Sequence, residues 1–198
     1  ISTLHELCDS PPWVPGDKTG GQLDPNVEKI AQVIMPAIME TWEAEDDRTA
    51  AIEICQSFAS CLNKCGPGLI SPQWIEPTCQ LTLQILEKKA PSQIDPEADE
   101  DEETEDSSEY ESVLISAAMD LVGAMAYVLC DSFMTPMRQF LPLLCKYYSP
   151  GRSVTDRATA IGSLGEITVN MKRAITPFTQ DILAILSHAV GDEDASVR

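Results

Sequence analysis

Apolar side chains recur every three or four residues in one stretch of this chain after another, which is the pattern of amphipathic helices. The clearest stretch predicts two helices folded back on each other, over residues 135–148 and 154–171. The apolar positions of the first are Met137, Phe140, Leu141, Leu144, Tyr147 and Tyr148. Thr135-Pro136 predicts its start, because a capping residue followed by proline favours a helix N-terminus. Ser149-Pro150-Gly151 predicts the sharp turn between the two helices.

The second of these helices is dense in small residues, among them Gly162 and Gly165. Each glycine would weaken an isolated helix by up to about 1 kcal/mol, so we expect neighbouring helices to approach closely at these positions. One such hairpin cannot bury its own apolar faces, and we therefore expect copies of it to be stacked on both sides.

Three further helices are predicted in the first half of the chain. The first begins at Asp24-Pro25 and should bend at Pro36, which removes a backbone donor and collides with the preceding turn. Its partner follows the turn 45–47 and ends at 66–68, and a third helix begins at Ser71-Pro72. The apolar positions of the three are Val27, Ile30, Ile34, Ile38 and Trp42, then Ala51, Ile54, Phe58, Cys61 and Leu62, then Trp74, Ile75, Cys79, Leu83 and Leu86.

A tight turn should follow the third helix, but residues 91–107 are instead interrupted by proline and then almost wholly acidic. Such a run repels itself and cannot bury apolar surface, so we expect it to be disordered or loosely held. Helix is expected to resume at Ser108, where Ser108 and Glu111 fit a capping box. From there to Cys130 the chain is apolar nearly all round, which predicts a helix covered on several sides.

Thr176-Pro177 predicts the start of one more helix near the end of the chain. Its apolar positions are Ile182, Leu183, Ile185, Leu186 and Val190. A turn is expected over 191–194, and residues 195–198 should begin the partner helix.

Helix pairs recur at intervals of about forty residues, which is the period of HEAT or armadillo repeats. Each pair has a proline inside its first helix, at Pro36 and Pro142, and an Asp-Arg dipeptide at the start of its second, at Asp47-Arg48 and Asp156-Arg157; an Asp and an Arg recur in 194–198. The acid complements the positive helix end, and the Arg can reach an acid of the neighbouring repeat. We therefore predict an all-α superhelix, a HEAT-repeat solenoid of about four hairpins with truncated ends. A generic helical bundle would show hairpins without this recurrence.

The whole chain is predicted to be a single array. Its expected divisions are 1–8 as the end of a preceding repeat, 24–66, 71–130 with the acidic insertion 91–107, 132–172 and the partial repeat 175–198. Residues 9–22 predict a loop, with Trp13 packed onto adjacent helices. The chain begins with Ile and ends in what resembles a helix start, so we expect an excerpt of a longer protein.

The charge of the chain is strongly negative and locally concentrated. Its net charge of −19 over 198 residues argues against binding nucleic-acid phosphates and for a basic partner. Eleven of the negative charges lie in 95–111, which contains no Lys or Arg. No apolar run approaches the roughly 20 residues of a membrane span, so membrane insertion is not expected.

Neither a metal site nor a catalytic site is predicted. Cys61 and Cys65 lie one helical turn apart, but the chain has only His5 and His188 and no CxxC pair, so we interpret its seven cysteines mainly as buried apolar filler. Gly-rich phosphate loops and a histidine near a plausible nucleophile are also missing from the sequence. We therefore expect no cofactor and no enzymatic activity.

Acidic residues are the candidates for partner binding. On a flexible tether, carboxylates would attract Lys- and Arg-rich segments by electrostatic steering, unless the run is merely a solvated insertion. This first group is Asp95, Glu97, Asp99, Glu100, Asp101, Glu102, Glu103, Glu105, Asp106, Glu109 and Glu111. The second group, which would line a groove on second helices, is Asp120, Asp156, Glu166 and Asn170. Helix-end charge balance and simple solvation are the ordinary alternatives for Asp156 and Glu166.

Five short sequence motifs, taken in their order along the chain, resemble those of a known family. They are Ser-Glu-Tyr-Glu-Ser-Val-Leu-Ile (108–115), Gln-Phe-Leu-Pro-Leu-Leu (139–144), Arg-Ser-Val-Thr-Asp-Arg-Ala-Thr-Ala-Ile-Gly-Ser-Leu-Gly-Glu-Ile (152–167), Ile-Thr-Pro-Phe (175–178) and Asp-Glu-Asp-Ala-Ser-Val-Arg (192–198). Preceded by the acidic run, they resemble the karyopherin-β (importin-β) family, and most of all its importin-4 branch. The resemblance is strongest over 95–198 and only general before that.

The resemblance implies a soluble nuclear transport receptor that shuttles between cytoplasm and nucleus. Such receptors bind basic cargo, in this branch histones and ribosomal proteins, contact phenylalanine-glycine nucleoporins, and release cargo when the GTPase Ran binds in its GTP form. The family's cargo and Ran surfaces would correspond here to the helices 109–130 and 152–171 and the loop 95–111. A HEAT scaffold subunit of a regulatory complex and a histone chaperone without transport activity are the alternatives.

Overall fold

The fold is described from a computed structural model for residues 25–94 and 105–198, except for the side chains of 105–108. Its helices are α2 (Pro25–Ala44), α3 (Arg48–Cys65), α4 (Pro72–Leu86), α5 (Glu105–Leu129), α6 (Met134–Tyr147), α7 (Val154–Met171) and α8 (Thr179–Ala189). Short 3₁₀ helices join them: η1 (Gly66–Leu69), η2 (Pro91–Gln93), η3 (Cys130–Phe133) and η4 (Lys172–Phe178). The predicted end of a preceding repeat, the loop with Trp13 and the cap at Asp24 lie outside the described residues.

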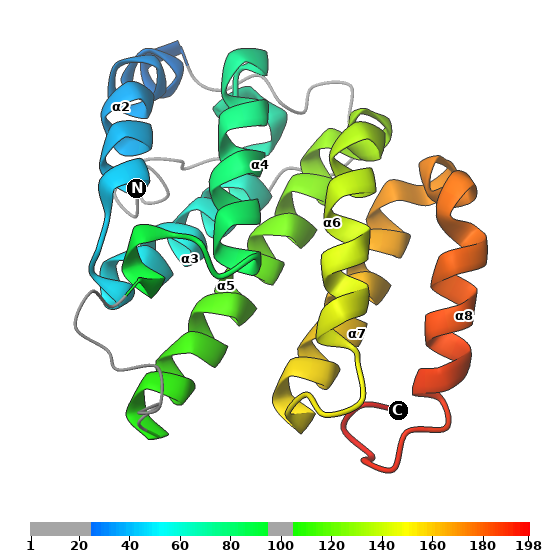
Figure 1. Ribbon diagram of the computed structural model, residues 1–198. Helices are drawn as coiled ribbons and strands as arrows, with labels where there is room; N and C mark the ends of the chain where they lie inside the picture. The colour runs from blue at the N-terminus through cyan, green and yellow to red at the C-terminus, as the bar shows by residue number, and fades with distance from the viewer. Residues whose placement is uncertain (1–24, 95–104) are drawn as a thin grey trace.

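The helices form two layers (Figure 1). The first helices of the hairpins, α2, α4, α6 and α8, stand in one row, and α3, α5 and α7 lie side by side behind them. Between α3 and α7, α5 is the centre of the second layer. This arrangement is an all-α, HEAT-like solenoid, and the predicted fold class is confirmed.

Side-chain caps fix the starts of two helices, α3 and α7. The Ser153 hydroxyl accepts a hydrogen bond from the backbone N–H of Asp156 at 3.0 Å, so α7 begins at Val154 and spans the predicted residues. Asp47 caps α3 in the same way, because its Oδ1 accepts from the N–H of Ala50 at 2.8 Å. Two predicted starts are wrong. Thr135 does not cap α6, which begins one residue earlier, directly after η3.

Thr176-Pro177 does not start a helix either, because it lies within η4, and α8 begins only at Thr179. Both errors have one physical cause: each 3₁₀ segment leads directly into the helix that follows, so no separate cap is needed there. Residues 195–198 form a turn rather than a helix, with Val197 buried beneath it.

The buried face of α2 differs from the predicted one. Its buried residues are Val27, Ala31, Met35, Met39 and Trp42. Ile30 is 39% exposed, and Ile34 and Ile38 only flank the core. The sequence of α2 has two neighbouring apolar stripes, one with the isoleucines and one with Ala31, Met35 and Met39. The second stripe is buried, because the small alanine and the flexible methionine side chains pack there.

The acidic insertion is shorter at both ends than predicted. Pro91–Gln93 form a packed 3₁₀ turn in which Ser92 is buried. The prediction that these three residues are disordered or loosely held is therefore wrong. At the other end, α5 begins at Glu105, which places Ser108 inside the helix rather than at its cap. Glu111 accepts a hydrogen bond from Gln93 Nε2 at 3.0 Å and pairs with Lys88 Nζ at 3.3 Å, instead of completing a capping box.

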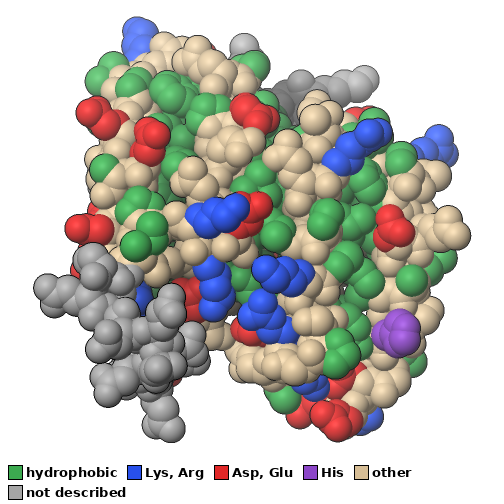
Figure 2. All heavy atoms as spheres, in the orientation of Figure 1, with side chains coloured by type: hydrophobic (Ala, Val, Ile, Leu, Met, Phe, Trp, Pro, Cys, Tyr) green, Lys and Arg blue, Asp and Glu red, His purple; other side chains and the backbone are tan. Residues whose placement is uncertain are grey.

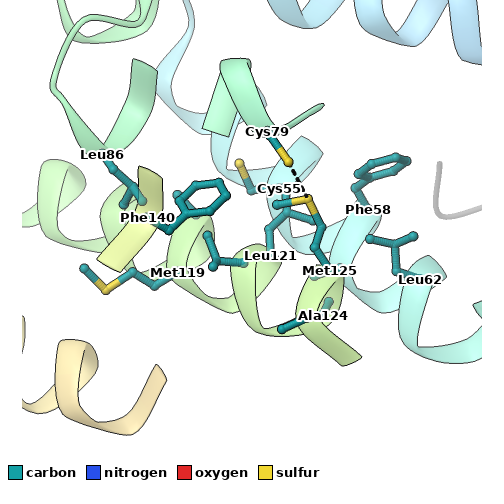
Figure 3. Packing of buried hydrophobic residues seen from close by; sticks show 14 of the residues in the cluster. Cys55, Phe58, Leu62, Cys79, Leu86, Met119, Leu121, Ala124, Met125 and Phe140 are labelled. Atoms are coloured by element: carbon teal, nitrogen blue, oxygen red, sulfur yellow. Dashed lines mark hydrogen bonds between the residues drawn. The ribbon is translucent and has the colours of Figure 1, made fainter. Parts of the chain in front are cut away.

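The central helix α5 is buried on several sides, as its sequence predicts. Its fully covered residues include Leu114, Ala118, Met119, Leu121, Val122, Ala124, Met125 and Ala126. Figure 3 shows how α4 meets it: the Cys79 thiol donates to the Met125 sulfur at 3.9 Å, with Leu121 and Phe140 close by. Cys55, Cys61, Cys65 and Cys79 are all buried, which confirms their reading as apolar filler, whereas Cys130 and Cys145 are partly exposed.

Within Glu109–Tyr147 one window of 18 residues has a mean hydropathy of 2.0, long and apolar enough for a membrane span by composition alone. The expectation that no apolar run approaches that length is therefore wrong. However, 67% of the window is buried inside the fold, so contacts with neighbouring helices account for its apolar character.

Specific polar contacts join successive hairpins. Arg157 Nε and Nη2 donate to the two carboxylate oxygens of Asp192 at 3.1 and 3.0 Å, which confirms the predicted link from a second helix to an acid of the next repeat. Arg48 also reaches the next repeat, where its Nε donates a hydrogen bond to the backbone oxygen of Ser92 at 3.0 Å. The buried Tyr147 hydroxyl donates to the Leu86 carbonyl at 2.9 Å and joins α6 to α4.

The second helices share one ending that the sequence analysis missed. Gly66, Cys130 and Lys172 directly follow α3, α5 and α7, and their φ values are +70°, +45° and +51°. Each opens a 3₁₀ helix that leads toward the next hairpin. A positive φ favours glycine, and only Gly66 is one. Cys130 and Lys172 are therefore strained by about 1–3 kcal/mol each.

Lys172→Gly should therefore raise the free energy of unfolding by about 1 kcal/mol, because glycine relieves the strain at a modest entropic cost. Urea unfolding followed by circular dichroism measures this change. The matched control is Arg173→Gly, which removes a neighbouring exposed charge at a residue without positive φ and should lower stability. Equal losses in both variants would contradict strain at Lys172.

Candidate partner-binding site

Two carboxylates from adjacent second helices form the centre of the candidate site. Asp120 projects from α5 and Glu166 from α7, and both side chains are exposed. Partial loss of water raises the pKa of each carboxyl group, and the charge of Asp120 raises the pKa of Glu166 further. In the described part of the chain, neither carboxylate has a Lys or Arg within ion-pair distance. A cation placed between them would relieve this repulsion.

Gly123 allows α7 to place polar groups against the backbone of α5. A Cβ atom at Gly123 would lie 2.9 Å from Glu166 Oε2, so any side chain there would displace the carboxylate. One turn further along α7, Asn170 Nδ2 donates to the Gly123 carbonyl at 3.4 Å. We call Asp120, Gly123, Glu166 and Asn170 the α5–α7 acidic site.

The close approach of helices thus occurs at a different glycine from those predicted. A Cβ atom at Gly162 or Gly165 would meet nothing within 4 Å, so the expectation of tight packing there is wrong. Gly162 is exposed and Gly165 is half-buried, whereas Gly123 is buried. Its signal in the sequence is that it is the one glycine in the long apolar stretch 113–129.

The structure separates Asp156 from the α5–α7 acidic site. Asp156 lies in the first turn of α7, ten residues or roughly 15 Å along the helix from Glu166. Its carboxylate lies 3.5 Å from Ser112 Oγ and 4.0 Å from Arg152 Nη1. Asp156 therefore complements the positive N-terminal end of α7 and contacts Ser112 on α5.

The remaining predicted acids lie on α5 or outside the described residues. Glu109 is exposed on α5, and Glu111 is engaged by Gln93 and Lys88 as described above. Glu105 and Asp106 lie in the first turn of α5, but their side chains are outside the described part. The predicted residues that lie wholly outside it are Asp95, Glu97, Asp99, Glu100, Asp101, Glu102 and Glu103.

The first-helix layer has a different surface. Figure 2 shows that Lys and Arg side chains gather over the middle and lower part of this face, with hydrophobic atoms in the seams between helices. This face is therefore not a continuous acidic surface. The acidic site that the sequence predicted belongs to the second-helix layer.

Two of the buried thiols are held in their protonated form, and the described residues form no cluster of metal ligands. Burial raises the pKa of the Cys55 and Cys79 thiols to about 12, which keeps them protonated and unreactive. Across residues 25–94 and 105–198, His, Cys, Asp and Glu form no group of three that could hold a metal ion.

Stacked helical hairpins with an exposed polar site on their second-helix layer define a helical-repeat protein of the HEAT type. No protein-family model matches the chain. However, the chain is 30% identical over its whole length to a probable importin subunit beta-4 of Schizosaccharomyces pombe. It is also 25% identical to importin-4 of Homo sapiens over 98% of the chain, and 26% identical to importin-4 of Mus musculus over 88%.

The chain belongs to the importin-β (karyopherin-β) family, as its sequence motifs predict. It spans only 19%, 18% and 16% of the lengths of these three relatives. Importins are transport receptors rather than enzymes, and they move between cytoplasm and nucleus.

Glu166→Gln should stabilise the protein at pH 7, and the gain should shrink as the pH falls. The raised pKa means that the ionised carboxylate is less favourable in the folded than in the unfolded protein, and protonation removes this penalty near and below the usual value of 4.5. Thermal unfolding of both proteins between pH 7 and pH 4 measures the difference.

Glu53→Gln is the matched control, because Glu53 is an exposed carboxylate on α3 outside the site. The same pH-dependent gain in both variants would show that overall charge, rather than the pairing of Asp120 with Glu166, is responsible.

Proposed function

We propose that this chain is a segment of a nuclear import receptor that binds basic protein cargo, and that the α5–α7 acidic site receives a lysine or arginine side chain. The observation that carries the proposal is the pair of exposed carboxylates, Asp120 and Glu166, which lie together without a cation from the described residues. An incoming cation would lower their mutual repulsion and hydrogen-bond to both.

The acidic run 95–103 extends this charge beyond the site. Its seven carboxylates would raise the rate of encounter with a basic segment, with strong salt dependence. Histones and ribosomal proteins have the required excess of Lys and Arg, and they are the cargo that the importin-4 resemblance implies. The division of the chain into the repeats 24–66, 71–130, 132–172 and 175–198 is part of the same proposal.

In the whole receptor, GTP-loaded Ran would release the cargo and phenylalanine-glycine nucleoporins would carry the complex through the nuclear pore. Both partners follow from the family resemblance and not from a site in the described residues. A HEAT scaffold subunit or a histone chaperone would share the acidic site, but neither would release its partner to Ran.

Neutralising the α5–α7 acidic site should weaken binding of a Lys/Arg-rich peptide about fivefold, because two partly hydrated ion pairs are lost. Fluorescence anisotropy with the double variant Asp120→Asn/Glu166→Gln measures this at two salt concentrations. The matched control is Glu40→Gln/Glu43→Gln, two exposed carboxylates on α2. Replacing the seven carboxylates of 95–103 by amides should mainly reduce the salt dependence. If the α2 control weakens binding as much as the site variant, the peptide senses only net charge.

GTP-loaded Ran should displace a labelled histone-tail peptide from the full-length receptor that contains this chain, whereas GDP-loaded Ran should not. Anisotropy during titration with each form of Ran gives the readout. Retention of the peptide at saturating GTP-loaded Ran would identify a scaffold or a chaperone instead of an import receptor.

A further inference from the structure

The outer side of α2 carries an apolar stripe that no described helix covers. Its residues are Ile30, Val33, Ile34 and Ala37, at the spacing i, i+3, i+4 and i+7 of one helical face. Ile30 and Val33 are 39% and 76% exposed, and Ala37 is exposed as well. We call these four residues the α2 outer stripe. A contiguous apolar stripe on the surface of a packed helix indicates a contact with a further element.

The packing of α2 shows which way this stripe faces. The Thr78 hydroxyl of α4 donates to Met39 Sδ at 3.9 Å, so one side of α2 faces α4. The Trp42 ring meets the Phe58 ring of α3 edge-on, with centroids 6.2 Å apart, so an adjacent side faces α3. The outer stripe lies roughly opposite to Met39 around the helix. In Figure 1, α2 stands at the end of its row, so the stripe faces away from the other described helices.

The segment 1–24 is the element that the chain itself offers for this contact. It joins α2 directly at Pro25, and the stripe begins little more than one helical turn further on, so a segment of this length reaches it without strain. Trp13 lies in the segment, and four of its other apolar residues recur at helical spacing: Ile1, Leu4, Leu7 and Cys8. The segment thus has an apolar pattern of its own to match the stripe.

The charges of the two elements are complementary as well. Lys29 borders the stripe one turn before Val33, and among the described residues it makes no ion pair. The segment carries Glu6 and Asp9 beside its apolar residues. A lysine at the edge of an apolar contact attracts an acid on the element that covers the contact.

We propose that the segment 1–24 packs its apolar residues against the α2 outer stripe and brings Glu6 or Asp9 to Lys29. The contact gives each of the two apolar stripes of α2 its own partner. The stripe with Ala31, Met35 and Met39 packs into the hairpin core, and the outer stripe packs against the segment. This contact does not depend on the binding of basic partners.

Cys8 reports on the contact, because a docked thiol reacts slowly with iodoacetamide. In the intact chain its alkylation, followed by mass spectrometry, should be about tenfold slower than in urea. The double variant Ile30→Gln/Val33→Gln should bring the rate to within about twofold of the rate in urea. The matched control is Val154→Gln/Val169→Gln on α7, at valines that are 40% and 73% exposed, and it should leave the rate unchanged. Circular dichroism verifies the helix content of both variants.

Leu4→Gln tests the contact from the segment, with Thr3→Gln as its control, and decides the result if the α2 variant loses helix. It should release Cys8 as the α2 variant does, whereas Thr3→Gln should not. Equally fast alkylation with and without urea would overturn the proposal. A rate that stays slow in the folded α2 variant or in Leu4→Gln would overturn it too, because the segment then packs elsewhere. Protection that rises with protein concentration would assign the stripe to a second copy of the chain instead.

Discussion

Burial of α5 is the constraint on which the rest of the structure depends. Its apolar side chains face α3, α4 and α7 at once, so each hairpin completes the core of its neighbour and none is stable alone. The same helix also carries Asp120 and Gly123, so a helix that is buried on several sides positions part of the candidate site. A site on such an element keeps its geometry when the surface around it changes.

Polar contacts fix how one hairpin sits on the next. The hydrogen bonds from Tyr147 to Leu86, from Arg48 to Ser92 and from Arg157 to Asp192 all cross between repeats, and each uses a side chain near the start or end of a helix. The Tyr147 bond lies within the core, and the other two are partly buried. The apolar core thus drives the stacking of the hairpins, and these hydrogen bonds fix how successive hairpins are aligned.

The charged features of the chain divide between its two layers. The α5–α7 acidic site lies on the second helices, whereas the first-helix face gathers basic side chains around apolar seams (Figure 2).

The sequence alone determined the fold class, the bounds of α7, the central burial of α5 and the family. These depend on the spacing of apolar residues and on the order of short motifs along the chain. The sequence also placed Asp120, Asp156, Glu166 and Asn170 in one candidate group, from which the structure separates Asp156. Only the tertiary structure showed that Ile30 stays exposed and that Gly123 rather than Gly162 brings two helices together. It also showed that Cys130 and Lys172 follow their helices in a strained backbone conformation. The reason is physical: which of two apolar stripes is buried, and which backbone is approached, depends on the shape of the neighbouring helix, and no local pattern encodes that shape.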